Sequence, residues 1–364
     1  LAHPGRIETF TVQALKRFSR MFLPRRTALG FGFSFLLAGA AAGPALADGV
    51  VNVYTYRQPS LINPLFEAFT KKTGIEVRAV FADNGLVERL AQEGRNSPAD
   101  LLITADVGRL VEAASRGLAQ PVTSPAILDK VPANLRDKDN LWFGLTMRAR
   151  VVYASVERAP ITAITYEELA DPKWKGKICM RPGNHPYNLG LIAAMIAHKG
   201  EDATREWLKG LKANLAVKPS GNDRSQAKSV FAGECDLALA NTYYMGKMLT
   251  NDQEPEQKEW AKSVKIVFPS SPDFGTHVNI SGVLLTANAP NKDNAVRLME
   301  YLASDEAQAL YANGNFEYPV NPKVPAADIV KSWGAFTPDT LNVAEVAKHE
   351  PAAAKLVDEV GFND

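Results

Sequence analysis

Residues 50–81, VVNVYTYRQPSLINPLFEAFTKKTGIEVRAVF, carry the pattern that decides the fold. Val50–Tyr56 alternates as a strand does, and Leu61–Lys72 has the apolar spacing of an amphipathic helix. Ile75–Phe81 is a second strand, so a helix joins two strands over a short stretch of chain. The same order continues with a helix predicted at 85–92, a strand at 100–104 and a helix at 107–116. This alternation of strands and helices predicts a doubly wound parallel sheet.

A second series of strands and helices begins near residue 150. Strands are predicted at 142–155, 177–180, 215–218 and 236–240, with helices at 189–198 and 225–231 among them. Extended segments near 146–156 and 276–284 cross from one series to the other. We therefore expect an α/β fold with two lobes, each a doubly wound sheet, joined by hinge strands. Lobe 1 is predicted at 48–148, with 282–364 returning to it, and lobe 2 at 149–281.

Residues 1–47 have the features of an upstream extension followed by a signal peptide. Arg25-Arg26 precedes an apolar run at 28–42, which is too short to span a bilayer comfortably. Ala45-Leu46-Ala47 fits the small-residue pattern at which signal peptidases cleave. We therefore expect export and cleavage after Ala47, and the sequence leaves open whether the Sec or the Tat route is used.

The charge of the chain gives no reason to expect a nucleic-acid partner. The whole sequence has a formal net charge of +1, but residues 1–47 hold six Lys or Arg and one acidic residue. The remainder has 35 basic and 39 acidic residues, which is a net charge of −4. A mildly acidic protein does not attract a polyanion, so we predict no nucleic-acid binding.

Three tyrosines follow two of the predicted strands of lobe 2. The strand at 177–180 runs into a loop that holds Tyr187, and the strand at 236–240 is followed by Tyr243 and Tyr244. Ligands of open α/β sheets bind at the carboxyl ends of the strands, so these phenols are candidates for one site. A phenolate is a hard anionic donor that suits ferric iron. The residues alone leave a second interpretation open, in which Tyr243 and Tyr244 are amphipathic residues at a helix start.

Five segments carry a resemblance to a known family. They are VNVYTYRQP at 51–59 and the segments at 101–110, 145–153, 241–244 and 279–282. They resemble the periplasmic ferric-ion-binding proteins of iron(III) ABC transporters, bacterial extracellular solute-binding proteins with a transferrin-like fold. The resemblance implies a periplasmic binding protein fold and Fe(III) ligated by Tyr187, Tyr243 and Tyr244. It also implies a monomer in the periplasm that delivers iron to the permease subunits of an ABC importer in the inner membrane.

One position departs from part of that family. One branch has His-Tyr directly after the arginine of the first motif, where this chain has Gln58-Pro59. Proline has no donor atom in its side chain, so a four-tyrosine site is excluded. The chain looks closer to a branch with three tyrosines, in which a carbonate or bicarbonate anion completes the iron shell. Arg57 and Arg148 are candidates for holding that anion, because a guanidinium presents a planar fork to a planar oxyanion. A surface or inter-lobe salt bridge remains an open alternative for Arg148.

Other ligands and other classes of protein agree less well with the sequence. Related two-lobed proteins bind thiamine, polyamines or phosphonates, which would keep the fold and change the ligand. A polyamine site would need acidic residues at the strand ends, where this chain has tyrosines and arginines. The sequence has no nucleophile–base pair, Gly-rich phosphate loop or zinc-ligand spacing, so we do not expect an enzyme.

The chain has two cysteines, Cys179 and Cys235. Each lies eight residues before a candidate ligand, Tyr187 and Tyr243 respectively. If their strands are parallel neighbours, the two sulfur atoms lie at a similar depth. A disulfide and a pair of buried thiols both fit the sequence.

Overall fold

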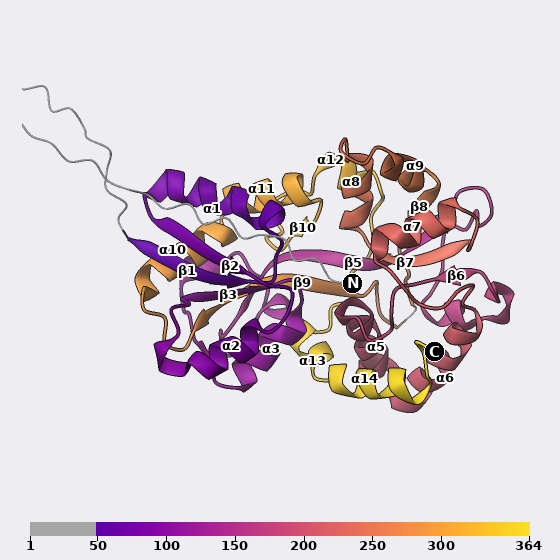
Figure 1. Ribbon diagram of the computed structural model, residues 1–364, viewed down its shortest axis with the longest axis horizontal. Coiled ribbons are helices and arrows are strands. Elements are labelled where there is room, and N and C mark those ends of the chain that lie inside the picture. Colours follow the sequence, from indigo (N-terminus) through magenta and orange to yellow (C-terminus); the bar gives the residue numbers. More distant parts are fainter. Residues whose placement is uncertain (1–48, 272) are drawn as a thin grey trace, which may run out of the picture. The chain divides into compact units, whose positions relative to one another are not determined.

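The structure, a computed structural model, describes residues 49–271 and 273–364 (Figure 1). The predicted upstream extension and signal peptide at 1–47 lie outside the described residues. No helix in the described ranges is long and apolar enough to cross a membrane.

The first lobe is built on the pattern of residues 50–116. Strand β1 (Val50–Thr55) pairs in parallel with β2 (Glu76–Phe81) on one side and with β3 (Leu101–Thr104) on the other. The helices between and after these strands are α1 (Pro59–Thr73), α2 (Leu86–Glu93) and α3 (Val107–Ser115). The predicted alternation of parallel strands and helices is therefore confirmed for this lobe.

The connection from β1 to α1 positions Arg57. The helix begins at Pro59, whose fixed φ and missing N–H suit the first turn of a helix. Arg57 consequently lies in a tight connection at the carboxyl end of β1, where an open sheet binds its ligand. The buried side chains of α1 follow helical spacing and anchor it on the sheet: Ile62, Leu65, Phe66 and Phe69.

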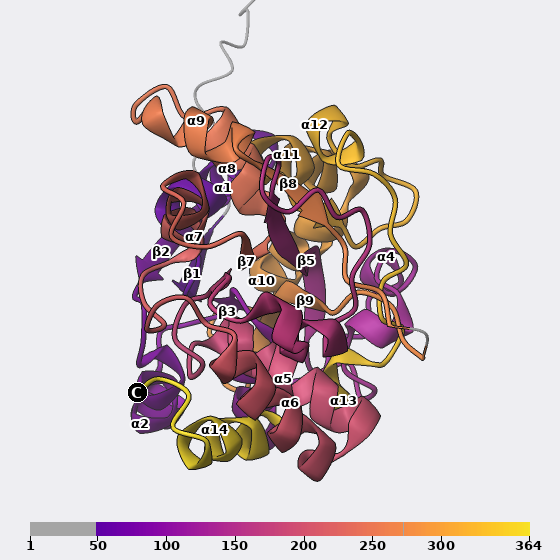
Figure 2. The same cartoon turned by 90° about the vertical axis from the view of Figure 1, so that its right-hand side faces the viewer.

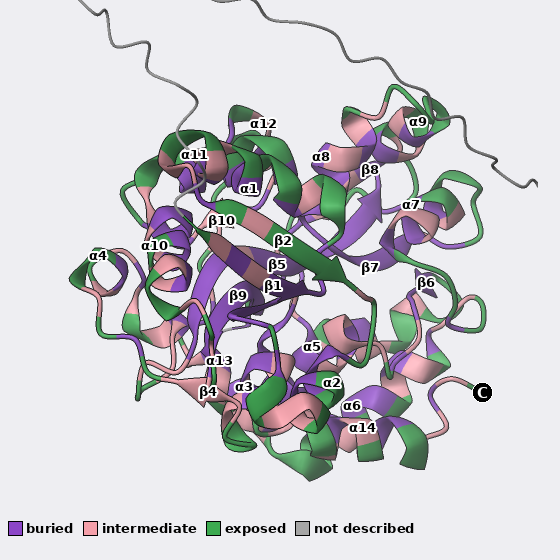
Figure 3. Ribbon diagram, turned by 60° about the vertical axis from the view of Figure 1, so that its left-hand side comes forward, coloured by how far each residue is buried: buried purple, intermediate pink, exposed green. Residues whose placement is uncertain are grey.

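Two long strands connect the lobes. Strands β5 (Phe143–Ser155) and β9 (Val278–Thr286) pair antiparallel and are buried along almost their whole length (Figure 3). Strand β9 also pairs with β3 of the first lobe, whereas β5 pairs with strand β7 (Leu237–Asn241) of the second. With β6 (Ile178–Cys179) at one end, one hydrogen-bonded order, β2-β1-β3-β9-β5-β7-β6, runs through both lobes. Strands β5 and β9 are the hinge strands predicted near 146–156 and 276–284.

The second lobe has helices on both faces of its sheet. Its elements are β6 (Ile178–Cys179), β7 (Leu237–Asn241), β8 (Val264–Val267), α5 (Pro186–Lys199), α6 (Glu201–Ala213), α7 (Asp223–Phe231), α8 (Tyr243–Leu249) and α9 (Glu256–Lys262). Leu237 and Leu239 of β7 pack in a core with α5 and α6, while Ala238 and Ala240 pack on the other face with α7, α8 and α9. Because successive side chains of a strand point to opposite faces, an unbroken apolar run fits a strand covered on both sides.

The segment predicted as a strand at 215–218 does not form one. Leu215 makes a single bridge with Ile178, and Val217 and Lys218 are exposed. Pro219 follows directly and cannot donate a hydrogen bond to a ladder, so the pairing does not extend.

The C-terminal part of the chain divides between the lobes. Its elements are α10 (Lys292–Ala303), α11 (Asp305–Asn315), β10 (Tyr318–Pro319), α12 (Asp328–Lys331), α13 (Val343–Ala347) and α14 (Glu350–Glu359). Two short elements, β4 (Ala119–Gln120) and α4 (Pro125–Leu128), lie much earlier in the chain, between α3 and β5. Helices α10 and α11 pack in the core of the first lobe, to which the sequence assigns the whole of 282–364. Helix α14 instead packs against α5 and α6 of the second lobe (Figure 2). The reason is its apolar face of Ala353, Leu356 and Val357, which completes the core of that lobe.

Cys179 and Cys235 form a disulfide, with their Cα atoms 5.9 Å apart. Cys179 lies in β6 and Cys235 lies just before β7, so the bond joins two neighbouring parallel strands. Both strands lead toward the candidate ligands, Tyr187 and Tyr243. The sequence leaves open a disulfide or two buried thiols, and the structure has the disulfide.

Removing the disulfide is expected to lower the free energy of unfolding by about 2–4 kcal/mol, because the crosslink restricts the unfolded chain. Urea unfolding of a Cys179→Ala, Cys235→Ala double variant beside the wild type measures the change. Thiol titration of the denatured, unreduced wild type should find no free thiol, whereas two reactive thiols would contradict the pairing.

Candidate metal centre

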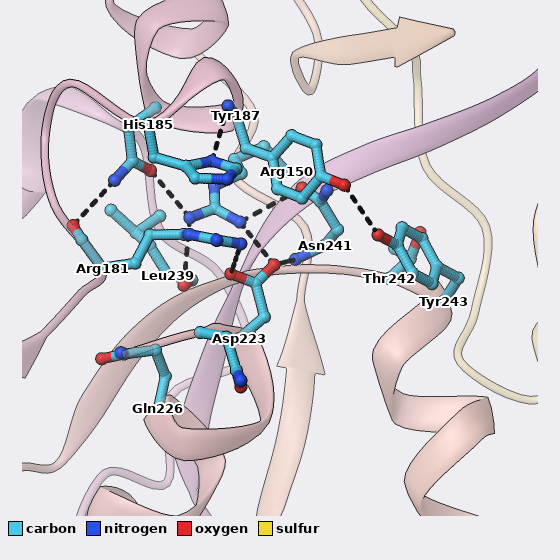
Figure 4. Close-up of polar contacts among 12 residues, drawn as sticks. Arg150, Arg181, His185, Tyr187, Asp223, Gln226, Leu239, Asn241, Thr242 and Tyr243 are labelled. Atoms are coloured by element: carbon cyan, nitrogen blue, oxygen red, sulfur yellow. Dashed lines mark hydrogen bonds and ion pairs between the residues drawn. The ribbon is translucent and has the colours of Figure 1, made fainter. Parts of the chain in front are cut away.

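The three candidate tyrosines lie together at the starts of two helices. Tyr187 is in the first turn of α5, and Tyr243 and Tyr244 are the first residues of α8. The hydroxyl oxygens of Tyr187 and Tyr243 are 3.1 Å apart, within hydrogen-bond distance (Figure 4). The ring of Tyr244 stacks on that of Tyr243 with 4.3 Å between the ring centroids. The structure thus brings the three predicted ligands to one place.

Local sequence explains why these helices start there. Pro186 occupies the first turn of α5, and Nδ1 of His185 accepts a hydrogen bond from the Tyr187 N–H at 3.2 Å. Tyr187, which the sequence places in a loop, is therefore helical. Strand β7 leads almost directly into α8, so Tyr243 and Tyr244 follow a strand and also begin a helix. This position agrees both with the interpretation of the two residues as ligands after a strand and with that of amphipathic residues at a helix start. Because β6 and β7 are parallel, the chain reaches α5 and α8 from the same edge of the sheet.

A buried polar network beneath the tyrosines holds the segments that carry them (Figure 4). Asp223, in the first turn of α7, is fully buried and pairs with Arg150 at 2.8 Å and with Arg181 at 3.2 Å. The same carboxylate accepts a hydrogen bond from the Asn241 N–H at 2.9 Å. Arg150 in turn donates to the side-chain oxygen of Asn188 at 2.7 Å. One carboxylate therefore ties together the loop before α5, the first turns of α5 and the end of β7.

This network was not predicted from the sequence. A signal for it was present, because Arg150 directly precedes the apolar run Val151-Val152-Tyr153-Ala154 of a predicted strand, and a charge in a buried strand needs a partner. Asp223 gave no such signal, since an acidic residue near Asn222 at a helix start resembles an ordinary cap, and Asn222 does cap α7.

Arg57 and Arg148 converge on a single hydroxyl group. The Oγ of Ser281, in β9, accepts a hydrogen bond from Arg57 Nη1 at 2.9 Å and from Arg148 Nη1 at 3.3 Å. Both guanidinium groups are buried, and Nε and Nη2 of each have no hydrogen-bond partner among the described residues. Glu317 lies 2.9 Å from Arg57 Nη1, whereas Arg148 forms no salt bridge within the described ranges. The alternative interpretation of Arg148 as a surface salt bridge does not fit its burial.

Burial dominates the electrostatics of the tyrosines. It raises the pKa of Tyr243 well above the ordinary value, and the neighbouring phenols of Tyr187 and Tyr244 raise this pKa further. Burial likewise raises the pKa of Tyr244, and it outweighs the opposite effect of Arg181. Both phenols are therefore neutral near pH 7, and a metal that binds them has to displace protons. Burial, with Arg181 nearby, lowers the pKa of His185 to about 3, so this imidazole is neutral as well.

A cavity of about 490 Å³ opens onto the three tyrosines. Its charged lining residues from the first lobe are Arg57, Asp83, Asp106 and Arg109, and those from the second are Arg181, Arg224 and Lys247. Cationic groups outnumber carboxylates, which favours ligands that carry or share negative charge. Arg148 is not part of this lining, but its guanidinium carbon lies 5.6 Å from the ring centroid of Tyr187.

Known proteins resemble this chain in sequence and in structure. The sequence pattern of the family described as bacterial extracellular solute-binding protein matches residues 64–338. Iron uptake protein A2 of Synechocystis sp. is 44% identical over 315 residues, which cover 86% of this chain and 90% of that protein.

Two solved structures extend the comparison. Apo ferric ion-binding protein A of Pasteurella haemolytica superposes with a TM-score of 0.83 and 50% identity, covering 86% of this chain and 98% of that one. A Trichodesmium protein in complex with iron and citrate gives a TM-score of 0.82 and 43% identity, covering 86% and 100% of the two chains.

The two solved structures share the fold of this chain, and each of the three relatives is named for iron uptake or binding or was solved with iron. Their names describe iron uptake or iron binding and no enzyme activity, which agrees with the sequence prediction that this chain is not an enzyme. The chain therefore belongs to the bacterial extracellular solute-binding proteins, among the relatives of the ferric-ion-binding proteins.

Proposed function

We propose that this protein binds Fe(III) in the periplasm through the phenolates of Tyr187, Tyr243 and Tyr244. The observation that carries the proposal is the meeting of these three phenols, from two separate helix starts, at one cavity. The iron named for the relatives supports the choice of metal.

The chemistry of the donors suits a small, highly charged cation. Three phenolates supply three negative charges, which match the charge of Fe(III) and avoid a net charge in a largely buried site. Phenolate oxygen is a hard donor, and tyrosinate is an established ligand of ferric haem iron.

The arginine pair supports an oxyanion as a further ligand of the iron. Arg57 and Arg148 are buried cations with Nε and Nη2 left without partners, and a planar oxyanion can accept hydrogen bonds from such a fork. Carbonate or bicarbonate fits this description and could fill two coordination positions that three phenolates leave open. The cavity also has room for a larger carboxylate such as citrate, which accompanies iron in the Trichodesmium structure.

Membership of the solute-binding family supports a role in transport across the inner membrane. In the proposal the protein acts as a monomer in the periplasm, and it delivers iron to the permease subunits of an ABC importer. Closure of the lobes about β5 and β9 would enclose the metal between Arg57 of the first lobe and the tyrosines of the second.

Other small ligands of the fold fit the site less well. A polyamine would face mostly arginines and a lysine, so charge repulsion disfavours it. Binding of thiamine or a phosphonate would not explain why three phenols cluster at the site, although a phosphonate could pair with the cationic side chains of the same cavity.

Titration of the metal-free protein with Fe(III) in bicarbonate buffer tests the proposal. We expect one iron per chain, held against competition by citrate, and no comparable binding of thiamine, spermidine or 2-aminoethylphosphonate. Binding of one of these organic ligands, with no retention of iron, would favour the alternative.

Arg57→Ala is expected to weaken iron retention about tenfold to a hundredfold, because the anion loses a principal hydrogen-bond donor. It should also shift the visible absorption band that arises from charge transfer between the tyrosine phenolates and iron. Since this change also leaves Glu317 buried without its cation, Arg148→Met is a useful companion that breaks no salt bridge among the described residues. Competition with citrate gives the affinities, and melting of the iron-free variants shows whether they fold. Unchanged affinity and spectrum in both variants would rule out these arginines as the anion site.

A further inference from the structure

Glu317 lies beside the proposed anion site and takes no part in the function proposed so far. It is fully buried between α11 and β10, and its Oε1 lies 2.9 Å from Arg57 Nη1. Its Oε2 accepts a hydrogen bond from the Thr146 hydroxyl of β5. Thr146 pairs in the sheet with Ser281, the residue on which Arg57 and Arg148 converge. The carboxylate and the two arginines therefore form one compact group on the hinge strands.

The charges of this group do not balance. Arg57 and Arg148 bring two buried positive charges, and Glu317 brings one negative charge. Buried charges are normally compensated, because an unpaired ion in a protein interior is costly. The unpartnered Nε and Nη2 atoms of both arginines mark where further negative charge can be accommodated. Arg57 would then lie between two anions, its own Glu317 at Nη1 and the bound oxyanion at Nε and Nη2.

We propose that Glu317 is a positioning residue that sets the affinity for the oxyanion, an inference that rests on the proposed function. Its carboxylate, with Ser281, engages Nη1 and so directs the remaining N–H groups of Arg57 toward the anion. The same carboxylate repels the anion, because like charges interact strongly at short range where water is excluded. Glu317 thus orients the arginine and at the same time limits how tightly the anion is held, which keeps the anion exchangeable when iron is released.

The segment that carries Glu317 also contacts the helix of the tyrosine pair. Phe316 has a left-handed backbone with φ of 59° and packs directly on Gly246 of α8, where any Cβ would collide with its ring. The neighbouring Lys247 donates a hydrogen bond to the Gly314 carbonyl at 2.8 Å. Glu317 is therefore held at a fixed place relative to α8, and through it the anion-binding arginine is held relative to Tyr243 and Tyr244.

The test is the bicarbonate concentration that half-saturates iron binding, measured with ferric nitrilotriacetate as the iron source. Glu317→Gln keeps the shape and removes the charge, so its midpoint is expected to fall about tenfold while the visible iron band stays in place. Thr146→Val is the matched control, because it removes the hydrogen bond to Glu317 and keeps the charge. Its midpoint is expected to stay within about twofold of the wild type.

The outcomes separate this proposal from the function on which it rests. An unchanged or raised midpoint in Glu317→Gln overturns the proposal for Glu317. An equal shift in Thr146→Val also overturns it, because the loss of a hydrogen bond around Glu317, and not the loss of its charge, would then explain both shifts. A coloured, bicarbonate-dependent wild type with an unshifted Glu317→Gln refutes this proposal alone. A wild type that binds no iron refutes the proposed function as well.

A second comparison covers the case in which Glu317→Gln does not fold because Arg57 is left unpaired. Arg57→Gln retains the repelling carboxylate, and the Arg57→Gln, Glu317→Gln double variant removes it. The double variant is expected to need about tenfold less bicarbonate than Arg57→Gln. An equal or greater requirement would overturn the proposal.

Discussion

Tyr243→Phe is expected to lower the affinity for Fe(III) by at least about a hundredfold, because it removes an anionic ligand of the metal. Loss of a residue that only hydrogen-bonds to a metal ligand already lowers metal affinity about tenfold to a hundredfold. Tyr244→Phe should have a similar effect, and Tyr187→Phe should act in the same direction. Phe keeps the aromatic ring, so the stacking of Tyr243 on Tyr244 and the packing below them survive.

Competition with citrate measures the affinities of these variants, and melting without iron shows that they fold. Tyr301→Phe is the matched control, because Tyr301 lies on α10 in the core of the first lobe, away from the cavity, and its hydroxyl has no partner among the described residues. It should bind iron as the wild type does. Full ferric binding by both Tyr243→Phe and Tyr244→Phe would remove the main support for an iron site.

Asp223→Asn is expected to lower the free energy of unfolding by about 3–5 kcal/mol, because it leaves Arg150 and Arg181 buried without a counter-charge. Variants that remain folded should also bind iron more weakly, since Asp223 holds the end of β7 and, through Arg150, the start of α5. Urea unfolding and iron titration measure the two effects.

Asp252→Asn provides the comparison for this prediction. Asp252 pairs with Lys258 on the surface, where solvent screens the interaction, so stability and iron binding should barely change. Equal stability of the Asp223 and Asp252 variants would show that the buried network does not hold the tyrosine segments.

The order of strands and helices was predictable because it depends on local periodicity. The pattern of residues 50–116 predicted the strands and helices of the first lobe, and the two long extended segments predicted the hinge strands β5 and β9. The candidate ligands were predictable for a related reason, since Tyr187 and Tyr243 follow strands whose carboxyl ends meet in a parallel arrangement. The helical position of Tyr187 was missed, because His185 acts as the cap of α5 and histidine is not among the residues that usually do so.

The polar partners of the site were not predictable, because they come from distant parts of the chain. Arg57 and Ser281 are 224 residues apart, and Arg150 and Asp223 are 73 residues apart. Charge and amphipathic spacing show that such residues need partners but not which ones. The same limit applies to α14, whose apolar face is visible in the sequence while the lobe that it covers is not.

The visible and resonance Raman spectra of the iron-loaded wild type test the central claim most directly. Ligation by the phenolates of Tyr187, Tyr243 and Tyr244 predicts a coloured protein, with a phenolate-to-iron charge-transfer band and enhanced tyrosine ring vibrations when that band is excited. A protein that holds one iron per chain and remains colourless, without those vibrations, would contradict tyrosinate ligation.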